Sequence, residues 1–416
     1  MRGWSSPPIP SNAVPSTDPS TAPVVQLHDT RTTALRPVLD HLAPGAAFRM
    51  YVCGITPYDA AHLGHASTYV AFDLLQRVIR DAGHPVRYVQ NVTDVDDPLL
   101  ERAMITGDQW SDLAEREIER FRLDMEALRI LAPDDYVGAV ESIPSVIDLV
   151  EQLKTTGAAY LVDDDWYFDV STDPEFNDVA QLDDAAALAI FAARGGDPDR
   201  PGKRHALDPL LWMAPRGDDP WWDGALGKGR PGWHIECVAI ANAGLGVSFD
   251  LQGGGSDLVF PHHQMCASIS RTLTGVDFAH AFAHTGMVAL DGEKMSKSKG
   301  NLEFVSRLRD AGHEPMAIRL ALLAQHYRSD WEWTPAHLSA ADERLARWRS
   351  GVRRAATPNP SPVVEALRAS LRHDLDTPAA IAAIDAWCHA DGDVIGGGDV
   401  LANAVDALLG VELTRQ

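Results

Sequence analysis

The 416-residue sequence is poor in lysine and cysteine, and it contains no long apolar run. The formal net charge of −23 argues against non-specific binding to nucleic acid or to an anionic membrane, although it does not exclude a local basic groove. Four scattered cysteines are too few for a disulfide scaffold, so metal binding or burial in a reducing compartment is expected. No stretch reaches the roughly 18 apolar residues of a membrane span.

The first 26 residues also lack the apolar core of a secretory signal. Prolines recur there among serines and threonines, which predicts a flexible or extended arm over residues 1–26. With neither a signal nor a membrane span, the cytoplasm is the expected location.

The stretch from Tyr51 to His65 organises the rest of the chain. Tyr51 and Val52 are typical of the end of a buried strand, and apolar residues recur at helical spacing as far as Ile79. Residues 53–64 are therefore the predicted turn between strand and helix, where open α/β sheets bind ligands. A second strand over Val86–Val92 completes the strand-helix-strand unit of a Rossmann-like, doubly wound parallel sheet.

The second half of the chain contains a further predicted strand and a helical C-terminal region. A strand is expected over Val247–Gln252, followed by a loop over Gly253–Asp257 that exposes its backbone, and Pro261 is expected to open the next helix. The predicted organisation is a first half of the catalytic domain over residues 27–140, an inserted α+β region over 141–229, a second half over 230–306, and a C-terminal helical bundle over 307–416.

Two short segments suggest nucleotide chemistry. His62 and His65 stand at a predicted helix N-terminus, which suits phosphate, although an ordinary helix start explains the same tetrapeptide. Lys294 and Lys297 lie three residues apart beside Gly300, so both can reach one polyphosphate and stabilise a departing pyrophosphate. A solvated basic loop is the alternative for that pair.

The HLGH sequence at His62–His65, followed by KMSKS at Lys294–Ser298, resembles the signature pair of the class I aminoacyl-tRNA synthetases. That resemblance implies a catalytic domain that makes an aminoacyl adenylate from ATP, with Mg²⁺. Four further segments are similar to the cysteine-activating branch of this class: Cys53–Asp59, Asn91–Asp97, Arg230–Cys237 and Phe260–His263. The resemblance covers roughly residues 45–335.

The cysteine-activating branch contains cysteinyl-tRNA synthetases and the shorter mycothiol-pathway ligases, which join cysteine to glucosaminyl-inositol. Ile55–Pro57, Asp97-Pro98, Arg194–Pro198 and the short region after Asn301 resemble the ligases. Residues 357–416 contain three arginines, no lysine and nine acids, the opposite of an RNA-binding surface. We therefore expect a monomeric, amide-forming ligase that uses L-cysteine, ATP and glucosaminyl-inositol and binds no tRNA, with a cysteinyl-tRNA synthetase as the alternative.

A metal explains how such an enzyme tells cysteine from serine. Pocket shape separates near-isosteres by only about a hundredfold, whereas zinc prefers a soft thiolate. The resemblance implies one zinc ion per chain, held by Cys53, Cys237 and His262, with a fourth position open for the substrate sulfur. Cys266 occupies the place of a glutamate ligand of the tRNA synthetases and could be a fourth ligand, although it would compete with the substrate.

The resemblance also implies roles for residues around the adenylate. Asp257 and Asp59 are the candidates for the base that deprotonates the acceptor amine, and neither is favoured by the sequence. Trp233 is expected to wall the amino-acid pocket, Val288 to meet the adenine, His62 and His65 to contact the ATP phosphates, and Lys294 and Lys297 to close over the pyrophosphate. The remaining expected contacts are Gly54, Ile55, Thr56, Thr68, Asn91, Val92, Thr93, Gly255, Ser256 and Asp257.

Two other classes of protein share part of this pattern. A nucleotidyltransferase would contain the first histidine motif but would not need Cys53, Cys237 and His262 together. An inactive binding protein derived from a synthetase often loses signature residues, and both signatures are intact here.

Overall fold

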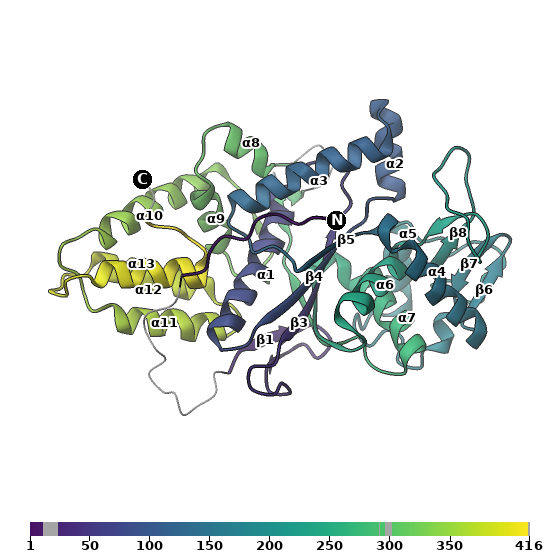
Figure 1. The fold of residues 1–416 in the computed structure, drawn as a ribbon, viewed down its shortest axis with the longest axis horizontal. Helices are drawn as coiled ribbons and strands as arrows, with labels where there is room; N and C mark the ends of the chain where they lie inside the picture. Colours follow the sequence, from purple (N-terminus) through teal and green to yellow (C-terminus); the bar gives the residue numbers. More distant parts are fainter. Residues whose placement is uncertain (11–23, 291, 296–301, 415–416) are drawn as a thin grey trace.

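The fold was analysed in a computed structural model that describes residues 1–10, 24–290, 292–295 and 302–414, without the side chains of Glu293 and Lys294. Its centre is a five-stranded parallel sheet in the order β11-β10-β3-β4-β5 (Figure 1). The chain runs outward from β3 to β5 and then returns to the other side of β3, so the strand order reverses between β3 and β10. The predicted doubly wound α/β fold is confirmed. The five strands are β3 (Phe48–Ile55), β4 (Val86–Val92), β5 (Asp135–Gly138), β10 (Phe249–Gly255) and β11 (Ala279–Thr285).

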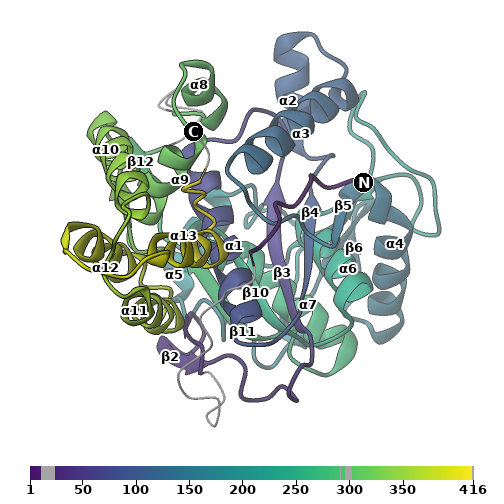
Figure 2. The ribbon, with the colours of Figure 1, turned by 60° about the vertical axis from the view of Figure 1, so that its left-hand side comes forward.

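The two faces of the sheet are covered by different helices (Figure 2). Successive side chains of β3 alternate between the faces, because the side-chain period of a strand is two. Met50 and Val52 join a core with α1 (Leu63–Asp81), whereas Tyr51 and Cys53 join a second core on the opposite face. The helices of that second face are α4 (Ala139–Thr156), α6 (Trp233–Leu245) and α7 (Gln264–Thr274).

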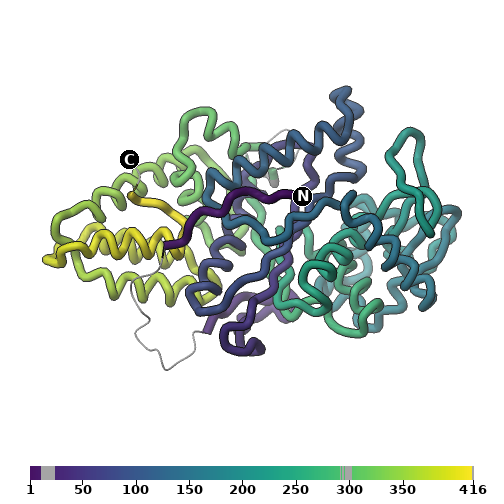
Figure 3. The backbone as a smooth tube through the Cα atoms, in the orientation of Figure 1, coloured from purple at the N-terminus to yellow at the C-terminus, as the bar shows by residue number. Residues whose placement is uncertain are grey.

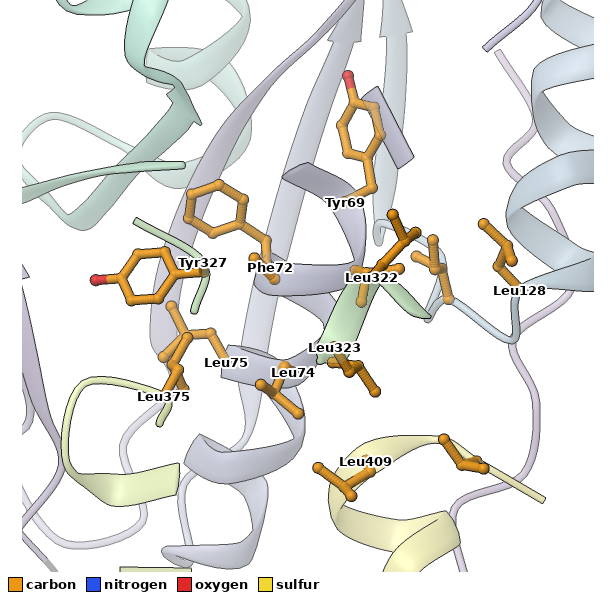
Figure 4. Close-up of a cluster of buried hydrophobic side chains, with 14 of the residues drawn as sticks. Tyr69, Phe72, Leu74, Leu75, Leu128, Leu322, Leu323, Tyr327, Leu375 and Leu409 are labelled. Carbon is orange, nitrogen blue, oxygen red and sulfur yellow. The ribbon is translucent and has the colours of Figure 1, made fainter. Parts of the chain in front are cut away.

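The α1 face continues into the C-terminal helices. Figure 4 shows Phe72 and Leu74 of α1 beside Leu323, Leu375 and Leu409, which belong to one continuous core. The C-terminal helices are α8 (Val305–Asp310), α9 (Pro315–Leu323), α10 (Pro335–Val352), α11 (Pro360–Arg372), α12 (Thr377–His389) and α13 (Gly397–Leu409).

A buried ion triad ties α1 to these helices. Asp73 accepts hydrogen bonds from Arg77 Nε at 2.9 Å and from Arg319, and all three side chains are fully buried. Arg319 also donates to the carbonyl oxygens of Leu409 and Leu128, at 2.7 and 2.8 Å. Burial alone would raise the pKa of Asp73, but the two guanidinium groups outweigh it and hold that pKa below its usual range.

The region between β5 and β10 forms a separate antiparallel sheet in the order β6-β7-β8-β9. It packs beside α4 and α6, at the end of the molecule opposite the C-terminal helices (Figure 1). Its strands are β6 (Ala159–Val162), β7 (Asp165–Phe168), β8 (Leu210–Met213) and β9 (Arg230–Pro231), and α5 (Asp184–Ala193) lies between β7 and β8.

Smaller elements complete the fold. The charged stretch from Pro98 to Leu131 forms two helices, α2 (Asp97–Thr106) and α3 (Trp110–Ala127). Among the described helices, none has the length and apolarity to cross a membrane. The remaining strands are β1 (Gln26–Asp29), β2 (Ala34–Pro37), β12 (Val288–Leu290), β13 (Glu293–Lys294) and β14 (Trp331–Glu332).

Residues 1–10 differ from the expected free arm, since their backbone follows the surface of the domain (Figure 3). Trp4 is only 8% exposed and its ring packs edge-on against Phe121 and Tyr136. Its Nε1 donates to the carbonyl oxygen of Ile130 at 2.7 Å. One aromatic side chain thus anchors a segment whose overall composition predicts disorder, while residues 11–23 lie outside the described part.

The glycine-rich segment also differs from its prediction, because Gly253 to Gly255 belong to β10 rather than to a loop. A Cβ atom on Gly253 would lie 2.3 Å from the ring of Phe72, so only glycine lets α1 approach the strand here. Pro261 stands where the prediction puts it, at the start of the helical backbone that leads into α7. Phe260 before it is extended (φ −137°, ψ 136°), and a π-helical turn over Val259–His263 continues into the regular helix at Gln264.

Candidate active site

A cavity of about 350 Å³ lies at the carboxyl ends of β3, β4 and β10, beside the N-terminus of α1. This is the point where the strand order reverses, which is where doubly wound folds bind ligands. The residues expected from the sequence that line it are Cys53, Gly54, Ile55, Thr56, His62, His65, Thr68, Asn91, Thr93, Trp233, Gly255, Asp257, His262 and Val288.

A few expected residues do not line this cavity. Val92 is fully buried in the core on the α1 face. Successive side chains of a strand point to opposite faces, so Val92 points away from the cavity that Asn91 and Thr93 line. Ser256 and Asp59 are also absent from its lining. Lys297 and the side chain of Lys294 lie outside the described residues.

Sequence reasoning missed several lining residues, among them Tyr58, Tyr69 and Met287. Tyr69 lies one helical turn after His65, and that spacing places both side chains on one face of α1. Its hydroxyl donates to the backbone carbonyl of Cys53 at 3.1 Å, which fixes the carboxyl end of β3.

Close packing of β3 against β4 shapes the floor of the cavity. The backbone N–H of Gly54 donates to Asn91 Oδ1 at 2.8 Å, and Asn91 Nδ2 donates to Thr93 Oγ1 at 3.2 Å. A Cβ atom on Gly54 would lie 1.7 Å from the carbonyl oxygen of Asn91, so the turn requires glycine.

The first turn of α1 presents two imidazoles. His62 is the N-cap, and its Nδ1 accepts from the backbone N–H groups of Gly64 and His65 at 3.1 and 3.4 Å. The rings of His62 and His65 stack with centroids 3.8 Å apart. Thr68, one turn later, lies 2.8 Å from the hydroxyl of Thr285. The imidazoles therefore stand at the positive end of the helix, beside the cavity.

Three side chains from separate segments converge beside the cavity, which Cys53 and His262 line and the fully buried Cys237 does not. Ligand atoms of Cys53, Cys237 and His262 lie within 4.8 Å of one another, and all three residues are buried. Cys237 Sγ is 3.3 Å from His262 Nε2. Cys266 Sγ lies 3.9 Å from the same nitrogen but also donates to the carbonyl oxygen of His234 at 3.4 Å. The residues expected as metal ligands are thus brought together, with Cys266 at their edge.

The protonation states in this cluster are uneven. Burial raises the pKa of Cys53 and of Cys266. Burial also opposes ionisation of Cys237, but hydrogen bonds from Cys266 and Cys53, together with His262, outweigh it and lower the pKa of that thiol well below its usual value. Two cysteine sulfurs and an imidazole nitrogen form a donor set that zinc prefers, and three donors leave one tetrahedral position open.

A row of histidines supports these three residues. His263 lies between Cys53 Sγ, 3.2 Å from its Nε2, and His284, 2.7 Å from its Nδ1. His284 in turn contacts Thr30 at 2.7 Å. Burial lowers the pKa of His263, and it lowers the pKa of His284 to about 3, so both rings are neutral. No local motif indicates His284, which becomes a neighbour of β10 only through the sheet register.

The other side of the cluster is closed by aromatic contacts. Trp233 stacks on His262 with centroids 4.2 Å apart and planes 18° from parallel. His262 Nδ1 lies 3.0 Å from His234 Nδ1. Trp233 lines the cavity together with Cys53 and His262.

The sequence matches known proteins over 99% of its length. Residues 41–343 match the family model described as the tRNA synthetases class I (C) catalytic domain. A Streptomyces griseus protein named L-cysteine:1D-myo-inositol 2-amino-2-deoxy-alpha-D-glucopyranoside ligase is 58% identical over 99% of this chain and 100% of its own length. A Kribbella flavida protein of the same name is 55% identical with the same coverage. The chain belongs to this ligase family.

Membership of the ligase family confirms the resemblance seen in the two signature motifs. A solved structure of Mycobacterium tuberculosis methionyl-tRNA synthetase bound by methionyl-adenylate matches this ligase-family chain with a TM-score of 0.61. The two sequences are 14% identical, and the match covers 88% of this chain and 92% of the other. The likeness shows that the ligase family shares the fold of the class I synthetases.

Proposed function

We propose that the protein is an ATP-dependent ligase that activates L-cysteine as cysteinyl-adenylate and transfers it to the amine of glucosaminyl-inositol, releasing AMP and diphosphate. The observation that carries this proposal is the convergence of Cys53, Cys237 and His262 at the strand-order reversal, where Cys53 and His262 line the cavity. Full-length identity of 58% to a protein named as this ligase supports the same substrates.

The first step needs the cysteine held by its sulfur with its carboxylate free. Zinc bound by Cys53, Cys237 and His262 would supply a soft acceptor for the substrate thiolate, which distinguishes cysteine from serine. Trp233 bounds the pocket, and the backbone of Gly54, Gly255 and Val288 lets the adenylate approach closely. His62 and His65 at the N-terminus of α1 stabilise the triphosphate, which arrives with Mg²⁺.

The second step transfers the cysteinyl group to an amine. The amine attacks the adenylate carbonyl, the carbon–oxygen bond to AMP breaks, and the ammonium proton must leave. Asp257 is the side chain that we assign to that proton, because it lines the adenylate cavity and also the neighbouring one. Lys294 and Lys297 are assigned to the departing pyrophosphate of the first step.

A cysteinyl-tRNA synthetase is the alternative, and the comparisons do not favour it. The relatives that match from end to end are named as the ligase. The acidic balance of residues 357–416 also opposes contact with an RNA backbone. We propose further that the protein acts as a monomer in the cytoplasm.

The deciding experiment compares acceptors. The zinc-loaded protein is assayed for cysteine-dependent pyrophosphate exchange, and then for product formation with glucosaminyl-inositol or with tRNA. We expect exchange with cysteine but not serine, and an amide product only with glucosaminyl-inositol. Metal removal by a chelator should abolish exchange, and added zinc should restore it. Aminoacylation of tRNA, or cysteine activation by the metal-free protein, would contradict the proposal.

A further inference from the structure

A second cavity of about 760 Å³ opens beside the adenylate cavity. The two share five lining residues, Thr56, Tyr58, Trp233, Asp257 and Leu258, so they adjoin along one shared wall. We call the second one the outer cavity. Its size lies within the range of pockets that bind small molecules, and it is more than twice the volume of the first.

The inserted antiparallel sheet builds much of the outer cavity. Leu210 and Met213 of β8 and Tyr167 of β7 lie on its wall, and the loop after α5 adds Arg194. Arg194 donates to the backbone carbonyl oxygens of Asp257 and Phe260, which fastens the insertion to the end of β10. The insertion thus extends the active site beyond the adenylate.

The outer cavity is acidic. Its arginines are engaged with acidic or carbonyl partners: Arg230 pairs with Asp97, and Arg200 pairs with Asp165. Carboxylates outnumber guanidinium groups on the wall, so the local potential is negative and favours a cation over a phosphate. The acidic lining residues are Asp96, Asp97, Glu101, Asp165, Asp197 and Asp257, against the arginines Arg194, Arg200 and Arg230.

Polar groups on this wall are held in place by one another. Tyr167 donates through its hydroxyl to Asp197, and Arg200 Nη1 donates to the same hydroxyl at 2.7 Å. Phe191 and Trp233 add aromatic faces. A polyhydroxylated ring needs this combination, because its hydroxyls pair with fixed carboxylates and guanidinium groups while its apolar ring face packs on an aromatic side chain.

We propose that the outer cavity binds the amino-sugar acceptor, with its ammonium group at the shared wall near Trp233 and Asp257 and its cyclitol ring toward β7 and β8. This assignment rests on the proposed function, since the amine must reach the adenylate carbonyl across that shared wall. The acidic lining also opposes entry of an RNA 3′ end, whose phosphates it would repel.

Asp96 offers a variant that changes charge and little else. It is the N-cap of α2, where its Oδ1 accepts from the backbone N–H of Asp97 at 2.9 Å. Asparagine caps helices about as well as aspartate, so Asp96→Asn should keep the helix start. Asp96 lines the outer cavity and not the adenylate cavity, so its charge bears on the acceptor.

The test measures the two half-reactions separately in the zinc-loaded full-length protein. Asp96→Asn should raise the KM for glucosaminyl-inositol at least about tenfold, while cysteine-dependent pyrophosphate exchange stays within about twofold of the wild type. Met213→Trp, which places a larger side chain in the outer cavity, should raise the same KM without loss of exchange. Leu161→Trp is the matched control, because Leu161 is 51% exposed on β6 of the same small sheet and outside the cavity.

Two results would overturn the acceptor assignment. One is an unchanged acceptor KM in both Asp96→Asn and Met213→Trp. The other is a parallel loss of exchange and ligation in both, which would place these residues with the adenylate. Failure of the proposed function would look different, because the wild type itself would then lack cysteine-dependent exchange or ligation to glucosaminyl-inositol.

Discussion

Two buried polar clusters lie on opposite faces of the central sheet, and they are built in different ways. On the α1 face, Asp73, Arg77 and Arg319 neutralise one another and bond to backbone groups. On the other face, Cys53, Cys237 and His262 point lone-pair atoms at one another, with no lysine or arginine among the cluster's residues.

The difference separates a structural network from a binding site. Opposite charges that neutralise each other need no further partner, and breaking such a buried pair lowers the free energy of unfolding. Converging sulfur and nitrogen donors suit a cation, and on the proposed function their energy appears when zinc binds. The following changes test this contrast, from the largest expected effect to the smallest.

Arg319→Met should destabilise the protein by about 3–5 kcal/mol, because Asp73 would keep its buried charge with one partner fewer and two carbonyl groups would lose their donor. Urea unfolding followed by circular dichroism measures the change. Arg347→Gln is the control, since Arg347 is exposed and 3.9 Å from Glu343, and its loss should cost less than about 0.5 kcal/mol. Equal small shifts in both variants would contradict the structural role of the triad.

Cys237→Ser should weaken zinc binding and lower cysteine-dependent exchange by at least about a hundredfold. Removal of a metal ligand should have a larger effect than removal of a residue that only hydrogen-bonds to a ligand. Its unfolding midpoint should move less than that of Arg319→Met. Metal analysis of the purified protein and exchange assays measure the effect. Cys388→Ser, in the C-terminal helices, should retain both zinc and activity. Full metal content in Cys237→Ser would refute the ligand assignment.

His263→Gln should lower zinc affinity and the kcat/KM for cysteine by about tenfold to a hundredfold, since His263 is the contact that positions Cys53 Sγ. A competition titration with a chelator and a cysteine saturation curve measure the two quantities. A metal affinity equal to the wild type would show that Cys53 needs no such support.

A fall in pH should affect the two clusters in different ranges. The folded pKa of Asp73 is lowered, so its contribution to stability is present above the unfolded value near 4 and is lost only as the pH falls through the folded pKa. Zinc ligands compete with protons at higher pH, because thiolate and neutral imidazole are the binding forms. Between pH 7 and 5 we expect zinc and activity to decline while the unfolding midpoint changes little. A parallel loss of both would contradict the comparison.

Much of the candidate site could be predicted from local sequence. The turn after Val52, the histidines at the start of α1 and the segment around Cys237 each follow from motifs within a few residues. Val92 and Ser256 do not line the cavity, because a motif gives positions in the chain, whereas cavity lining depends on which face each side chain takes.

The arm and the glycine loop show a different limit. Trp4 is buried against residues more than 100 positions away, and the amino-acid composition of a segment does not predict a single long-range contact of this kind. Gly253 looked like loop sequence, but it is the place where α1 presses against β10. His284 and the outer cavity had no local indication, because both arise where distant segments pack together.

The sequence alone determined the parallel sheet and the family, and its motifs named three candidate donor residues, because period-two and helical patterns and short motifs are local properties of the chain. Only the tertiary structure decided that Cys53 faces α6, that His263 and His284 support it, and that the insertion encloses a second cavity beside the first. These depend on strand order and register, which bring residues separated by some two hundred positions within contact distance.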